Sequence, residues 1–106
     1  MTEKRVVMTT AGSVDEARRI AEYLIERKLA ACVNIVPKVV SIYRWKGKTE
    51  EAEEWLLWIK TAAAFERVRD AILEIHSYEL PECLAIAIED GSPAYLKWLD
   101  EASQQG

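Results

Sequence analysis

Three side chains in this sequence have the chemistry of metal ligands: Cys32, His76 and Glu82. Cys32 offers a thiolate, which soft ions such as Cu(I) prefer, whereas imidazole and carboxylate suit Cu(II) and other divalent cations. His76 is the only histidine and stands six residues before Glu82. Pro81 restricts the residue before it to extended geometry, which helps to hold this loop open. The sequence therefore predicts that His76 and Glu82 face one opening, suited to a divalent cation or a small polar ligand.

Each of these side chains also has a structural interpretation that the sequence leaves open. A free cysteine on a strand often serves as a small buried hydrophobic residue, and this applies to Cys32 and more strongly to Cys83. A histidine at a helix end, such as His76, can act as a partner of the helix dipole and nothing more. The two cysteines lie in separate apolar runs, far apart in the chain. We expect them to be reduced thiols that do not pair with each other.

The loop after residue 75 is also predicted to line a polar cleft. Loop residues of mixed chemistry are more often functional than residues of a core. We expect the other wall of the cleft to come from the central hairpin of a neighbouring subunit. The predicted lining residues are Tyr43, Trp45, Lys60, His76, Tyr78, Pro81 and Glu82.

The chain has few features of an enzyme. It contains no Gly-rich phosphate loop and none of the H-E-x-x-H, C-x-x-C or G-x-S-x-G motifs. No motif indicates an organic cofactor. We therefore expect a binding protein rather than a catalyst.

The charge composition limits the classes of partner that the protein can bind. The 106 residues carry 14 Lys and Arg against 18 Asp and Glu, which gives a net charge of −4. This balance argues against nucleic acid or an anionic membrane as the main partner. The N-terminal stretch lacks the apolar segment of a signal peptide, and no window is apolar enough to span a membrane. The expected location is the cytoplasm.

The first half of the chain positions these residues on a helix and a long hairpin. Residues 5–10 form a short apolar strand, and Ser13 with Glu16 forms a capping box that starts a helix. Residues 31–45 form a long strand, in which Pro37 removes a ladder donor and predicts a bulge or bend. After a turn at residues 46–48 the chain returns through residues 53–60, and the acidic run 50–54 is expected to face the basic hairpin tip.

The second half repeats the helix and strand pattern. Thr61 is expected to cap a second helix, which ends near His76. Residues 83–88 form the fourth strand, with Leu84 and Ile86 expected to face the helices and the small Ala85 and Ala87 on the other face. A short last helix starts at residues 92–93, where Ser and Pro provide the start signal.

This order predicts an α+β, ferredoxin-like β-α-β-β-α-β two-layer sandwich in a single domain of residues 1–106, with a long central hairpin and a short C-terminal helix. Both helices of that fold cover one sheet face, yet the long hairpin is apolar on both faces. Fifteen extended residues span roughly 50 Å, so the hairpin must overhang its own domain or lie across another. We therefore expect the chain to assemble through its sheet.

Five segments of the chain resemble the CutA divalent-cation tolerance proteins: residues 26–37, 41–48, 59–61, 76–82 and 95–99. The resemblance covers nearly the whole chain and implies a tight homotrimer in which the hairpins contribute to packing between subunits. It also implies a role in tolerance of copper and other divalent metals, with such an ion as the bound group. Of three cysteines proposed as copper ligands in the family, only Cys32 is matched here, because Thr9 and Ala71 stand at the other two positions. The family's His-Pro-Tyr is His76-Ser77-Tyr78 in this chain.

A second class of function stays open from the sequence. The PII signalling proteins share the trimeric ferredoxin-like plan and bind small molecules in clefts between subunits. The present chain could be such a small-molecule sensor, although it has no obvious glycine turn for an anion. The two alternatives are therefore a metal-binding tolerance protein and a PII-like sensor.

Overall fold

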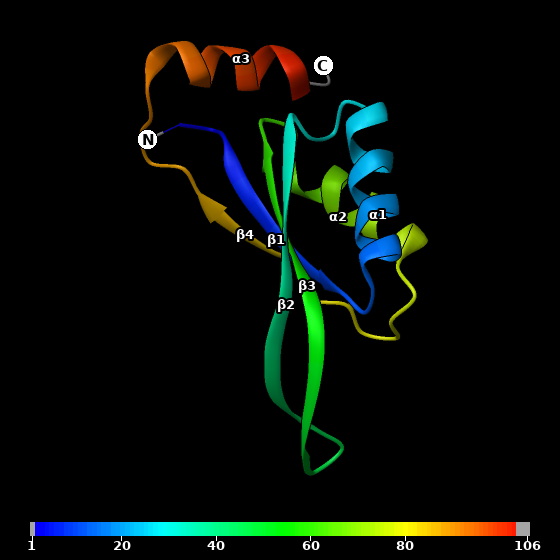
Figure 1. Ribbon diagram of the computed structural model, residues 1–106. Coiled ribbons are helices and arrows are strands. Elements are labelled where there is room, and N and C mark those ends of the chain that lie inside the picture. Colours follow the sequence, from blue (N-terminus) through cyan, green and yellow to red (C-terminus); the bar gives the residue numbers. More distant parts are fainter. Residues whose placement is uncertain (1, 104–106) are drawn as a thin grey trace.

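Seven elements follow one another in the order expected from the sequence (Figure 1). The protein is described from a computed structural model, in which residues 2–103 are described; residues 1 and 104–106 of the predicted domain lie outside them. The elements are β1 (Arg5–Ala11), α1 (Val14–Glu26), β2 (Cys32–Trp45), β3 (Lys48–Thr61), α2 (Phe65–Ile75), β4 (Leu84–Ala87) and α3 (Pro93–Ser103). None of the helices within the described residues has the length and apolar character needed to cross a membrane.

The strands form one antiparallel sheet in the order β2-β3-β1-β4. This is the ferredoxin-like order, so the predicted α+β fold is confirmed for the subunit. Helices α1 and α2 lie together on one side of the sheet, and α3 crosses the end opposite the hairpin turn (Figure 1). The subunit therefore has two layers, with one sheet face turned toward α1 and α2.

The core lies between the sheet and these two helices. Val7 of β1 pairs with Ile59 of β3, and both side chains are fully buried. They pack in one cluster with Ile20 of α1 and Ile72 of α2, which are also fully buried. Ala17, Ile20, Ala21 and Leu24 form the apolar stripe of α1 that enters this core, because helix positions three and four apart share one face.

The predicted capping box of α1 is confirmed, but the predicted cap of α2 is wrong. Ser13 accepts a hydrogen bond from the Glu16 N–H at 3.1 Å. Helix α2 begins four residues after Thr61, behind Ala64, which provides no side-chain cap. Thr61 instead ends β3, where its hydroxyl donates to the Leu29 carbonyl and accepts from the Ala63 N–H. A threonine that closes a tight connection has the same local sequence signal as a helix cap.

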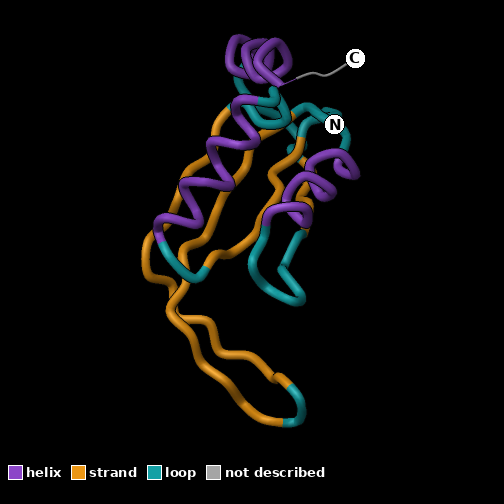
Figure 2. The backbone as a smooth tube through the Cα atoms, turned by 90° about the vertical axis from the view of Figure 1, so that its right-hand side faces the viewer, coloured by secondary structure: helices purple, strands orange, loops and turns teal. Residues whose placement is uncertain are grey.

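The hairpin of β2 and β3 projects beyond the rest of the subunit (Figures 1 and 2) and gives the molecule its long axis of 44 Å. The bulge predicted at Pro37 is confirmed, because the register shifts between Val36 and Val39 and Lys38 has a left-handed φ of 57°. Lys46 and Gly47 make the turn with φ values of 51° and 81°, as a two-residue hairpin turn of the primed type requires.

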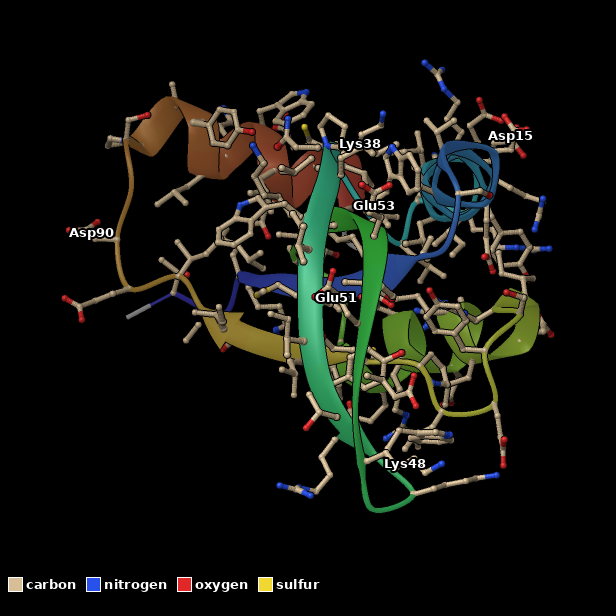
Figure 3. All side chains as sticks on the ribbon, turned by 60° about the horizontal axis from the view of Figure 1, so that its bottom comes forward. Asp15, Lys38, Lys48, Glu51, Glu53 and Asp90 are labelled. Atoms are coloured by element: carbon tan, nitrogen blue, oxygen red, sulfur yellow. The ribbon has the colours of Figure 1, made fainter. Side chains whose placement is uncertain are left out.

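The predicted pairing of acidic and basic residues across the hairpin is wrong. The register places Glu50 opposite Tyr43 and Glu51 opposite Ile42, while Arg44 faces Thr49. Glu51 and Glu53 lie between the hairpin turn, marked by Lys48, and the body of the subunit (Figure 3). The turn and the bulge set this register, and together they place the acids opposite uncharged side chains.

The predicted orientation of β4 is also wrong. Ala85 pairs with the core residue Val7, so the small side chain faces the helices. Leu84 and Ile86 pair with Met8 and Val6 and therefore point to the other sheet face, which we call the open face. A run that is apolar at every position cannot show by alternation which face it buries.

The open face is apolar and largely uncovered in the described subunit. Because paired residues share a face, Val36 and Trp58 lie on it together with Leu84 and Ile86. Their exposed fractions are 42%, 36%, 58% and 48%. An exposed apolar patch of this kind marks a surface that binds another protein surface or a ligand.

Candidate functional site

A cleft of about 650 Å³ lies between the hairpin and the loop that joins α2 to β4. In Figure 2 the hairpin bends toward the side of the view on which this loop lies. Both walls belong to one chain, whereas the sequence led us to expect the hairpin of a neighbour. The lining residues are Thr10, Ser41, Ile42, Tyr43, Arg44, Trp45, Glu54, Tyr78, Glu79, Leu80 and Glu82.

Four of the seven residues predicted for the cleft line it: Tyr43, Trp45, Tyr78 and Glu82. The other three do not. Lys60 lies at the opposite end of β3, with its ammonium 5.7 Å from the centre of the Tyr95 ring. His76 and Pro81 belong to the loop that forms the wall, but their side chains are outside the lining.

His76 supports the loop from inside the protein. Its side chain is fully buried, and its Nε2 lies 2.7 Å from the Thr10 carbonyl oxygen, so Nε2 must carry the proton and donate it. Its Nδ1 accepts the Tyr78 N–H at 3.1 Å. Both ring nitrogens are therefore engaged in hydrogen bonds within the protein, and neither offers a free lone pair to a cation. The position that the sequence indicated as a ligand instead holds Tyr78 in place.

The start of the same loop is tied to α1 by a buried carboxylate. Glu16 accepts hydrogen bonds from the Ser77 N–H and the Ser77 hydroxyl, each at 2.9 Å. Burial acts to raise the pKa of Glu16, but the hydrogen bonds that the Ser77 N–H and hydroxyl donate to it lower the pKa, and the overall shift is downward. Glu16 is thus an ionised anchor whose negative charge lies 3.6 Å from His76 Nδ1.

Tyr78 crosses from the loop to the hairpin and ends on Glu54. Its hydroxyl donates to Glu54 Oε2 at 2.7 Å. Burial, and then the hydrogen bond to Glu54 and its charge, raise the pKa of Tyr78, so the phenol stays protonated. Gly12 leaves room for this crossing, because a Cβ added there would lie 3.2 Å from the Tyr78 hydroxyl oxygen. The loop wall and the hairpin wall of the cleft are therefore joined by one hydrogen bond.

Glu54 is the functional candidate that sequence reasoning missed. It is 8% exposed, which is rare for a glutamate, and it lines the cleft with Glu82. Partial burial and then the charge of Glu54 raise the pKa of Glu82. The signal in the sequence was the acidic run before Trp55, but the run contains four glutamates and only the register of the hairpin decides which one turns inward.

Cys32 lies away from this cleft. It pairs with Lys60, which pairs with Val6, whereas the cleft begins at Thr10, four residues or about 13 Å along β1. Its thiol is half-buried on the open face, with Sγ 3.9 Å from Asn34 Oδ1. Cys32, His76 and Glu82 are not gathered in one place, and residues 2–103 contain no group of three or more His, Cys, Asp or Glu that could hold a metal ion.

Comparison with known protein families gives a match that covers most of the chain. Residues 5–102 match the family described as "CutA1 divalent ion tolerance protein". The chain belongs to the CutA1 family. The resemblance seen in the sequence is thereby confirmed, and it extends over nearly the entire chain.

Individual CutA1 relatives are similar along most of this chain. The "Divalent-cation tolerance protein CutA" of Thermus thermophilus is 46% identical over 99 residues, covering 92% of this chain and 96% of the relative. The "Protein CutA homolog" of Xenopus laevis is 48% identical over 80% of this chain, which spans 57% of that longer protein. The solved structure of a periplasmic divalent cation tolerance protein CutA from Archaeoglobus fulgidus has a TM-score of 0.89 and 44% identity, with coverage of 94% of this chain and 98% of the other.

Proposed function

We propose that this CutA1 protein is a cytoplasmic homotrimer that contributes to tolerance of copper and other divalent cations by binding metal ions, without catalysing a reaction. The observation that carries metal binding is the position of Glu54 and Glu82 in one cleft. Burial, and then repulsion by the charge of Glu54, raise the pKa of Glu82. A divalent cation between them relieves this repulsion, so the cleft is suited to bind a cation with water completing its ligands.

The homotrimer is supported by the open face. Val36, Trp58, Leu84 and Ile86 expose large apolar area on it. Copies of the same sheet face can cover one another, which buries this area at an interface resembling a divided core. Such an interface also places the half-buried thiol of Cys32 near the neighbouring subunits, where a soft metal ion would find further ligands.

A cytoplasmic location is supported by the cysteines. Cys32 and Cys83 are both free thiols, as proteins of a reducing compartment usually keep them. The relative from Archaeoglobus fulgidus, in contrast, is described as periplasmic. Detection of this protein in cell fractions of its host tests this part of the proposal directly.

Calorimetric titration of the purified protein with Cu(II) and Zn(II) tests metal binding. We expect saturable binding to the wild-type protein and about tenfold weaker binding to Glu54→Gln, because a charged ligand is lost. Glu53→Gln is the matched control, since Glu53 is adjacent but exposed on the opposite face of the hairpin. Equal affinity of both variants and the wild type would exclude the cleft as the metal site, and Cys32→Ser then tests the alternative site at Cys32.

A PII-like role as a small-molecule sensor is the second candidate function. It is favoured by the size of the cleft, because about 650 Å³ is within the range of pockets for organic ligands and far exceeds the volume of one metal ion. The aromatic side chains of Tyr43, Trp45 and Tyr78 line it. Binding of a small organic molecule to the metal-free protein distinguishes this candidate from the first.

A further inference from the structure

The two ends of the cleft differ in chemistry. Glu54 pairs with Val39 next to the bulge, so it lies at the end where the hairpin leaves the body of the subunit. Trp45 pairs with Lys48 at the turn, six positions further along β2. At about 3.3 Å per residue these two positions are about 20 Å apart along the hairpin. A ligand that fills the cleft therefore meets a different environment at each end.

The end at the body is anionic and has unused hydrogen-bonding capacity. Glu54 and Glu82 bring two carboxylates there, against the neutral hydroxyl of Tyr78. Thr10 is 7% exposed, lines the cleft beside them and makes no side-chain hydrogen bond to a described residue. Thr10 pairs with Leu56, and Glu54 is two positions along β3 on the same face, so the two side chains are diagonal neighbours. A hydrogen-bond donor on a ligand can therefore reach the Thr10 hydroxyl and the Glu54 carboxylate together.

The end at the hairpin turn is apolar and aromatic. Trp45 lines the cleft at the turn, and the exposed apolar side chains of Ile42 and Leu80, at 67% and 72%, belong to the same lining. The Trp45 ring already has a cation near it, since the Lys46 ammonium lies 5.8 Å from its centre. Arg44 and Glu79 contribute one further charge of each sign to the lining. The net charge of the cleft is therefore set by the carboxylates at the other end.

We propose that the cleft binds an organic ammonium ion with an apolar tail, with its ammonium group at Glu54, Glu82 and Thr10 and its tail along Tyr43, Leu80 and Trp45. The inference rests on the second candidate function, the cleft as a small-molecule site, and names the class of ligand. An ammonium group has three donors, which match two carboxylates and one hydroxyl. The apolar tail removes exposed Leu80 and Ile42 surface from water, and the aromatic rings attract the cation as it enters.

The test is a titration of the metal-free protein, in its native assembly, with phenethylammonium and with its neutral analogue 2-phenylethanol. We expect saturable quenching or a shift of tryptophan emission with the amine, and binding at least about tenfold weaker for the alcohol, because the charge-assisted contacts are missing. Glu54→Gln should weaken amine binding about tenfold, and the exposed neighbour Glu53→Gln should leave it unchanged. Thermal melts of both variants establish that each is folded.

Two further outcomes overturn the inference. Equal binding of the amine and the alcohol would mean that the carboxylates do not select a cation. No binding of the amine to folded wild-type protein would mean that the cleft is not a site for this class. A parallel Zn(II) titration of the same samples separates the proposed metal site from the proposed ammonium site. Binding of Zn(II) without binding of the amine would contradict the ammonium site and leave the metal site standing. Tyr43→Leu adds an independent check, because it should weaken amine binding and leave the Zn(II) affinity unchanged.

Discussion

At the scale of single residues, the cleft depends on a short series of hydrogen bonds. His76 fixes the Tyr78 N–H, and the Tyr78 hydroxyl reaches Glu54. Ser77, between them, is held by Glu16 on α1. The departure from the family's His-Pro-Tyr therefore has a structural role here, because proline has no N–H and no hydroxyl to donate to Glu16.

Replacing Ser77 tests this anchor. Ser77→Ala keeps the backbone donor and removes the hydroxyl, so we expect a loss of about 1–2 kcal/mol of unfolding free energy at pH 7. The pKa of Glu16 is lower in the folded protein than its ordinary value of 4.5. The ionised carboxylate therefore stabilises the fold above pH 4.5, and this stabilisation is lost as the pH falls through the lowered pKa. The difference from wild type should therefore shrink at pH 3. Urea unfolding at both pH values and one protein concentration measures it, with Ser41→Ala as the control.

The residue scale also shows where sequence reasoning reached its limit. Tyr78 and Glu82 were predicted for the cleft and line it, because polar and aromatic residues in one short loop must share a small region. Glu54 was not found, since its burial depends on the bulge 17 residues earlier at Pro37 and on the register that the bulge sets. His76 was expected to point outward, and only the contact with Thr10, 66 residues earlier in the chain, turns it into the core.

At the scale of elements, the capping box, the apolar stripe of α1 and the proline bulge were predictable because each depends on neighbours within a few residues. The orientation of β4 was not, because all its residues are apolar and only the pairing with β1 decides which face is buried. For α3 the local pattern predicts the helix, but its contact with the end of β3 through Ser103 joins residues that are 41 apart in the chain. The orientation of β4 and the contact of α3 with β3 therefore depend on long-range pairing and not on local propensity.

The docking of α3 gives a prediction at this scale. Ser103 is fully buried; it accepts the Ala62 N–H at 2.8 Å and donates to the Leu99 carbonyl at 2.6 Å. Ser103→Ala leaves the Ala62 N–H without its acceptor, so we expect a loss of about 1–3 kcal/mol. Amide hydrogen exchange should accelerate at Ala62 and along α3, while the core amides of α1 keep their protection. Unchanged exchange at Ala62 would contradict the anchoring role of Ser103.

At the scale of the whole molecule, the open face of the sheet is the apolar surface that a single subunit leaves exposed to water. One side of the sheet is covered by α1 and α2, while the other exposes large apolar side chains from β2, β3 and β4. Burial of apolar area contributes about 25 cal/mol per Å², so this surface favours association. Thr10 and Glu54 of the cleft share the open face with Val36, so assembly and binding are expected to influence each other.

Two matched substitutions test whether association uses the open face. Ile86 on the open face and Leu73 on α2 are each 48% exposed in the subunit. Ile86→Asp places a charge in the proposed interface and should dissociate the assembly, because an unpaired buried charge is costly. Leu73→Asp should leave the assembly intact. Sedimentation velocity of both variants measures the outcome, and dissociation by Leu73→Asp alone would move the interface to the helical side.

The most direct measurement is the mass of the wild-type protein in solution by light scattering at micromolar concentration. The homotrimer predicts three times the chain mass of 12.1 kDa, without a detectable folded monomer on dilution through the micromolar range. This result would show that the exposed apolar face is covered by copies of the same chain. A mass of one chain would contradict the account, because the open face would then be exposed to water in the working protein.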